Sequence, residues 1–114
     1  MGGFMTHNSS LEANIAAAKA AVHEMMKSWN HWKNARDEHA KNEYIGIYAA
    51  AFTSCKVYIE NYLKRLYPNE KKMPLKVAED IRKIVHEMDR IEKVNDQMLK
   101  KVLKDIDQLS RDAA

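Results

Sequence analysis

Residues 11–32, LEANIAAAKAAVHEMMKSWNHW, contain the pattern that decides the fold of this 114-residue chain. Apolar side chains recur there in alternating steps of four and three, which is the spacing of the buried face of a helix packed along other helices. The members of this series are Leu11, Ile15, Ala18, Val22, Met25, Trp29 and Trp32. Ser9 and Glu12 match a capping box, so we expect a helix to start at this point.

A second apolar series with the same spacing occupies residues 45–66. Its members are Ile45, Tyr48, Phe52, Cys55, Ile59, Tyr62 and Leu66. The two series are out of phase by one residue, and the polar stretch KNARDEHAKNE at 33–43 separates them. One straight helix through both would have to bury charged side chains. We therefore predict a break between Asn34 and Asn42.

A third apolar series begins after two prolines. Pro68 disfavours helical geometry in the residue before it and so ends the second helix, whereas Pro74 suits the first turn of a third helix. The members of the third series are Leu75, Ala78, Ile81, Ile84, Met88, Ile91, Met98, Val102, Ile106 and Leu109. Only Asn95 interrupts it. This Asn either fixes the register of one long helix or caps a new one, and we favour the cap because helices of even length cover their own apolar faces.

The sequence thus predicts an all-α antiparallel helical bundle, with four helices favoured over three. With 46% hydrophobic and 31% charged residues, the composition excludes an intrinsically disordered chain. The length suits one hydrophobic core. We expect a flexible N-terminus at 1–8, a single bundle domain at 9–111 and a tail at 112–114.

Membrane association is expected only through a lipid. No apolar run approaches the roughly 18 residues that a spanning helix needs, and no secretory leader is recognisable, so we expect a cytoplasmic protein. Gly2 and Thr6 match the N-myristoylation pattern. A single acyl chain usually needs a basic cluster nearby, yet the first lysine is Lys19. We therefore expect no membrane binding unless Gly2 is myristoylated.

The metal-binding and thiol residue types form no recognisable site. His23, His31 and His39 are spaced by eight residues, which turns a helix about 80° beyond two full turns, so they cannot meet at one ion. Cys55 is the single cysteine and lies within an apolar series, where we expect a buried, inert thiol. We predict no metal and no cofactor.

Enzymatic activity is the third-ranked hypothesis. Arg82 and His86 are similar to the Arg-then-His signature of small helical ribonucleases called HEPN domains. The gap between them is shorter than in that motif, and Lys83 stands where a polar residue usually follows the Arg. We therefore do not assign this family and expect an exposed helix face. No other catalytic constellation is recognisable, so we predict that the protein is not an enzyme.

Basic residues gather around the turn at residues 64–76 and form one candidate binding surface. Such a cluster attracts phosphates through a salt-sensitive interaction, and tyrosines within it could stack on unpaired bases. The residues proposed for nucleic-acid binding are Lys64, Arg65, Tyr67, Lys71, Lys72 and Lys76. Cations at a helix C-terminus also complement the helix dipole, and Tyr62 belongs to an apolar series, so ordinary packing explains the same residues.

Large apolar side chains form the other candidate surface. Met26, Trp29 and Trp32 are either core fillers or an adaptable binding face, since Met repacks and Trp anchors interfaces. If the third helix continues through Asn95, the apolar residues after it stay uncovered and await a partner. The residues proposed for protein binding are Met26, Trp29, Trp32, Met98, Val102 and Ile106.

The function predicted from these patterns is a small, non-enzymatic protein-interaction module. It would serve as an adaptor, inhibitor or regulatory subunit and act through a helical surface, on another protein or on its own copy. The alternative is a nucleic-acid-binding regulator that uses the basic loop at 64–76.

Overall fold

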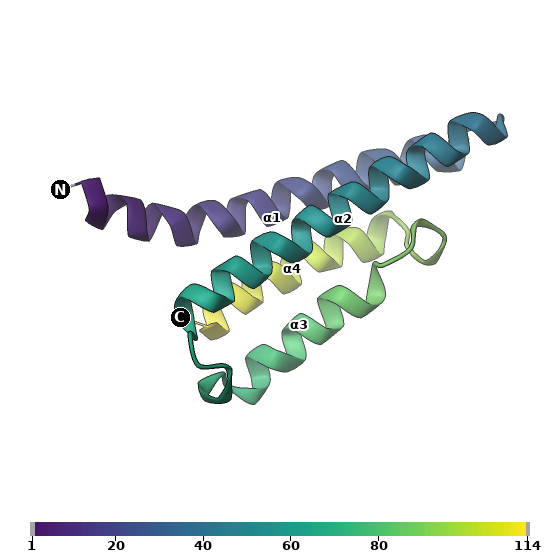
Figure 1. The fold of residues 1–114 in the computed structure, drawn as a ribbon. Coiled ribbons are helices and arrows are strands. Elements are labelled where there is room, and N and C mark those ends of the chain that lie inside the picture. Colours follow the sequence, from purple (N-terminus) through teal and green to yellow (C-terminus); the bar gives the residue numbers. More distant parts are fainter. Residues whose placement is uncertain (1, 114) are drawn as a thin grey trace.

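A computed structural model describes residues 2–113, with side chains from residue 11 onward, and it is an all-α bundle (Figure 1). The four α-helices are α1 (Gly2–Asn34), α2 (Glu38–Leu66), α3 (Leu75–Glu87) and α4 (Asp96–Ala113). Two short 3-10 turns, η1 (Glu70–Lys72) and η2 (Ile91–Lys93), lie in the connections. The predicted all-α class and the preference for four helices are confirmed.

Helices α1 and α2 form a long hairpin, against which the two shorter helices pack. Helix α1 lies along α2 and α4, and α3 lies along α4. The turn of the hairpin extends past the near ends of α3 and α4 (Figure 1). A 2.9 Å ion pair between Lys19 and Asp107 joins α1 to α4 at the surface. The molecule is elongated, with extents of 51 × 32 × 20 Å.

The first break lies within the predicted interval but is shorter than expected. Helix α1 ends at Asn34 and α2 begins at Glu38, so most of the polar stretch belongs to the first turns of α2. His39 and Glu43, whose side chains approach to 3.6 Å, lie on its exposed surface. A helix at the tip of a hairpin has little to cover, so its first turns can be polar all round.

The start of α1 differs from the prediction. The helix begins at Gly2, so the Ser9 capping box does not mark its N-terminus. The side chains of residues 1–10 lie outside the described part of the structure, and a flexible segment at 1–8 and acylation at Gly2 stay predictions. Helix α4 continues through Ala113, two residues into the expected tail.

Asn95 caps α4, as the preferred interpretation of the third series requires. Its side-chain Oδ1 accepts a 2.9 Å hydrogen bond from the backbone amide of Met98, which has no partner inside the helix. Helix α3 nevertheless ends at Glu87, well before this cap. The predicted continuation of the third helix to Asn95 is wrong, because an irregular connection with one 3-10 turn fills the interval.

This connection between α3 and α4 is part of the core. Met88, Ile91 and Val94 are buried in it. The hydroxyl of buried Tyr48 in α2 donates a 2.7 Å hydrogen bond to the carbonyl oxygen of Met88. The bond satisfies a backbone acceptor at the end of α3 and fixes the connection to α2.

Most members of the predicted series form the core, with two clear exceptions. Leu75 is 73% exposed, and Val77, which is not a member of the series, is fully buried. Leu75 is the first residue of α3, so the buried face of this short helix starts later. Ile45 is 40% exposed because the first turns of α2 lie near the hairpin turn. Among the described helices, none is long and apolar enough to cross a membrane.

Candidate functional site

A groove between the end of α1 and the start of α4 is the first candidate site. Its volume is about 490 Å³, and Met26, Trp29 and Lys33 of α1 face Asp96 of α4 across it. Met26 and Trp29 are half-buried and pack on the core with their inner sides. The Lys33 ammonium lies 4.7 Å from the centre of the Trp29 ring, within the range of a cation–π contact. Lys27 also lines the groove, which therefore combines an apolar floor with two cations and one carboxylate.

Trp32 is separate from this groove. It packs between the two helices of the hairpin, where the Lys41 ammonium of α2 lies 5.5 Å from its ring centre. Next to it, His31 of α1 stacks on Tyr44 of α2 with ring centres 5.1 Å apart. The structure thus brings Met26 and Trp29 together, whereas Trp32 helps to hold the hairpin closed.

Two of the three α4 residues proposed for protein binding, Val102 and Ile106, are core residues instead. Val102 is 1% exposed and Ile106 is fully buried, and Met98 is half-buried. The uncovered stripe predicted for a continuous third helix does not exist, because the chain turns at Asn95 and packs α4 against α1. Val102 and Ile106 are therefore not available at the surface of the folded chain.

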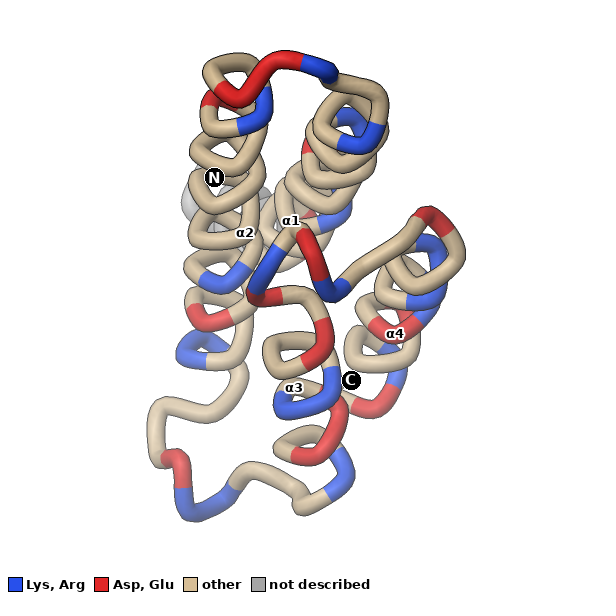
Figure 2. Tube along the Cα trace, turned by 90° about the vertical axis from the view of Figure 1, so that its right-hand side faces the viewer, with Lys and Arg blue, Asp and Glu red and all other residues tan. Residues whose placement is uncertain are grey.

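The basic cluster is exposed, but its tyrosines are not. Figure 2 shows Lys and Arg positions at the end of α2, in the loop after it and at the start of α3. The Tyr67 hydroxyl donates to the carbonyl oxygen of Ala113 at 3.0 Å, and that of buried Tyr62 to Ser110 at 3.4 Å. Both rings hold the end of α4 against α2. Tyr67 is half-buried and its hydroxyl has a partner, so base stacking by this ring stays a prediction that the packing makes less favourable.

The cations of the cluster differ in their partners. Lys76 lies 3.5 Å from Asp80, one turn later in α3. The other four cations are exposed and make no ion pair among the residues that the structure describes: Lys64, Arg65, Lys71 and Lys72. The side chain of Asn69 accepts a 3.1 Å hydrogen bond from the Lys71 amide and shapes the turn that presents the two loop lysines.

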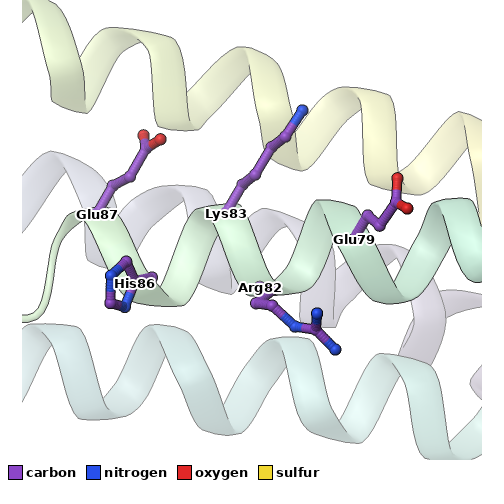
Figure 3. Close-up of a pocket in the computed structure, with 5 residues that line it drawn as sticks. All are labelled: Glu79, Arg82, Lys83, His86 and Glu87. Atoms are coloured by element: carbon purple, nitrogen blue, oxygen red, sulfur yellow. The ribbon is translucent and has the colours of Figure 1, made fainter.

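The outer face of α3 forms a shallow hollow lined by Glu79, Arg82, Lys83, His86 and Glu87 (Figure 3). All of these side chains come from one helix. Arg82 and His86 point toward α2, whereas the other three point toward α4 (Figure 3). Charges of both signs diverge on this surface instead of meeting at one point. The exposed face predicted for Arg82 and His86 is confirmed.

Sequence reasoning missed a pair of carboxyl groups between α3 and α4. Burial raises the pKa of Asp80 above its usual value of 3.8, and a hydrogen bond with Asp112 adds to the effect, while Lys76 opposes it. The same hydrogen bond lowers the pKa of Asp112. The Oδ2 atoms of both residues are buried, and no other group donates a hydrogen bond to them. One proton shared between the two carboxyl groups would supply the missing hydrogen bond. Sequence spacing shows only Lys76 and Asp80 one turn apart, which is typical of an exposed face.

Cys55 is fully buried, and burial raises the pKa of its thiol to about 12. The expectation of a buried thiol is confirmed. Among the side chains of residues 11–113, no group of three or more from His, Cys, Asp or Glu gathers as metal ligands.

Comparison of the chain with models of protein families, with curated proteins and with solved structures found no match. A function is therefore inferred from the chain's own surfaces. The groove at Met26 and Trp29 is notable among them because a methionine and a tryptophan ring line it beside charges of both signs.

Proposed function

We propose that this protein is a small, cytoplasmic, non-enzymatic interaction module that binds another protein in the groove between α1 and α4. The supporting observation is that Met26 and Trp29 remain half-exposed in an open groove, beside Lys33 and Asp96. Trp is enriched among the residues that dominate binding energy, and Met adapts its shape to different partners. An adaptor, an inhibitor and a regulatory subunit would all use such a surface.

The chemistry of the groove favours a partner segment with one apolar anchor. The anchor would displace water from the Trp29 ring, and charged groups beside it would meet Lys33 and Asp96 at the rim. Asp96 already pairs with Lys100 at 2.9 Å, so a cation on the partner would share its carboxylate.

A photo-crosslinking amino acid at Asn30, which lines the groove, tests this proposal in native cell lysate. We expect a covalent adduct with another protein that resists nuclease and disappears with Trp29→Ala. Glu79→Ala, on the outer face of α3, is the matched control and should leave the adduct unchanged. An adduct pattern that is identical with and without Trp29 would refute the groove as the binding site.

A nucleic-acid-binding regulator is the second candidate function. It is supported by four exposed cations at the end of α2 and in the following loop that make no ion pair with the side chains of residues 11–113: Lys64, Arg65, Lys71 and Lys72. Replacing Lys71 and Lys72 with Glu should weaken binding to nucleic acids of every sequence, since contacts to phosphates do not distinguish the bases. The affinity should also depend less steeply on salt concentration.

The matched control for this candidate reverses two exposed charges on α4, with Lys101→Glu and Lys104→Glu, and should leave the salt dependence unchanged. Gel-shift or filter-binding assays at low salt provide the measurement. If the wild type retains neither single-stranded RNA nor duplex DNA, this second function is excluded.

A further inference from the structure

The outward side of α2 exposes large apolar side chains. Ile47 is 48% exposed, Val57 44% and Tyr58 36%. Between Glu43 and Lys64 the other exposed residues include a single charged one, and they are Ile45, Gly46, Ala49, Ala50, Thr53, Ser54, Glu60 and Asn61. Helix α2 thus has a second face, opposite the one that it buries against α1, that is apolar or neutral along its centre and has Glu60 at its border.

The spacing of this face matches a helix–helix seam. Glu43, Ala50, Val57 and Lys64 follow one another at intervals of seven residues, which keeps one line of the helix toward a neighbouring helix. A Cβ atom added at Gly46 would meet nothing within 4 Å, so the face is open there. In Figure 2, α2 forms one edge of the molecule, and α1, α3 and α4 all lie on its other side.

The charges at the two ends of the face are opposite. Glu43 stands at the beginning of this face, and its partner within the chain is the exposed His39 at 3.6 Å. Lys64 and Arg65 stand at its end and form no ion pair among the described residues. A second helix with the same sequence, lying antiparallel, would place its own basic end beside Glu43.

We propose that this face binds a second copy of the chain, so that two α2 helices pack antiparallel around a two-fold axis between Thr53 and Ser54. The symmetry then forms the contact between Glu43 and the basic pair twice. The same axis places the small Ala50 of each copy opposite the larger Val57 of the other. A parallel arrangement would instead bring like charges together at both ends.

This dimer surface is separate from the groove at Trp29, so the two proposals can fail independently. The self-complementary order of charge and size along one helix identifies a second copy, and not an unrelated protein, as the occupant. Closely approaching helices exclude water from Ile47, Val57 and Tyr58, which is the driving force for the association.

Sedimentation equilibrium of the full chain over a range of concentrations tests the dimer. The wild type should approach twice the chain mass of 13.2 kDa. Ala50→Glu should return it to a single chain without changing the far-UV circular dichroism or the melting temperature. Ala20→Glu, at an exposed position of α1, is the matched control and should leave the dimer intact. A wild type that stays at one chain mass at every concentration would overturn the proposal. It would be overturned even if Ala50→Glu then abolished the capture of a different protein, because the face would bind that protein and not a second copy.

Disulfide trapping tests the orientation. Ser54→Cys lies next to the proposed axis, so two copies should cross-link rapidly under mild oxidation, whereas Ala50→Cys should cross-link far more slowly. Native Cys55 is buried and should not interfere. Equal cross-linking of both variants would indicate parallel helices and overturn the antiparallel arrangement.

Charge reversal tests the ion pairs at the two ends of the face. Glu43→Lys alone should weaken the dimer, and adding Lys64→Glu with Arg65→Glu should restore it.

Discussion

Asp80 and Asp112 make the stability of the bundle depend on pH in opposite directions. Burial raises the pKa of Asp80, so the folded chain holds this proton at a pH where the unfolded chain has released it. That contribution to stability is full below the ordinary carboxyl pKa and is lost as the pH rises through the raised value. The pKa of Asp112 is lowered, so its contribution is present above the ordinary pKa and is lost as the pH falls.

Replacing Asp80 with Asn should therefore raise the melting temperature near pH 7. The amide removes the buried negative charge and donates a hydrogen bond to Asp112 in place of the shared proton. The gain should shrink as the pH falls through the raised pKa of Asp80, because Asp80 itself is then protonated. Thermal unfolding followed by circular dichroism over this range measures it, with Glu92→Gln as an exposed control. A gain of equal size at both ends of the range would contradict the assignment.

The Cys55 thiol should resist alkylation in the folded protein. It is fully buried, and its pKa of about 12 leaves almost no reactive thiolate near neutral pH. Mass spectrometry after iodoacetamide treatment should find a modification rate that follows unfolding as denaturant is added. Rapid modification without denaturant would show that the region around Cys55 opens locally.

At the level of helices, Asn95 is expected to stabilise α4 by capping its first turn. Asn95→Ala removes the 2.9 Å bond to the Met98 amide and should lower the free energy of unfolding by about 1 kcal/mol. Asn95→Asp keeps the acceptor and should retain most of the stability. Urea unfolding of the three proteins measures the difference. Equal losses for the two variants would mean that the bond does not account for the effect.

The helices that the sequence predicted well have long, regular apolar series. The core faces of α1 and α2 follow from such series, and the cap at Asn95 follows from the one polar interruption. The end of α3 could not be predicted, because Met88, Ile91 and Val94 keep a near-helical spacing while they lie in a connection. That connection is held by the hydroxyl of Tyr48, forty residues away in sequence. A long-range bond of this kind leaves no trace in local periodicity.

The candidate sites were predictable to the extent that one helix forms them. Met26 and Trp29 lie one turn apart, so the sequence alone places them together. Asp96 joins them only because α4 packs along α1, and the contact between Asp80 and Asp112 depends on which face α3 turns toward α4. Such contributions from two helices become visible only when the packing is known.

For the molecule as a whole, α4 is the element on which both α1 and α3 pack, so a charge in its core should unfold the chain. Val102→Glu would bury an uncompensated carboxylate, at a cost on the order of 3–5 kcal/mol. This is a large part of the roughly 5–15 kcal/mol that stabilises an ordinary domain. Circular dichroism should show lost helix, and Lys104→Glu on the exposed side of α4 should not. A folded Val102→Glu variant would show that α4 is peripheral.

The up-and-down order of the four helices has a consequence for tethering. Because α1 and α3 run toward the hairpin turn and α2 and α4 run back, the beginning of α1 and the end of α4 both lie away from that turn (Figure 1). A bead, a sensor chip or a fused fluorescent protein attached at either end would hold the molecule with the hairpin turn and the neighbouring groove facing outward. Immobilised protein would therefore offer Trp29 to solution whichever end is anchored.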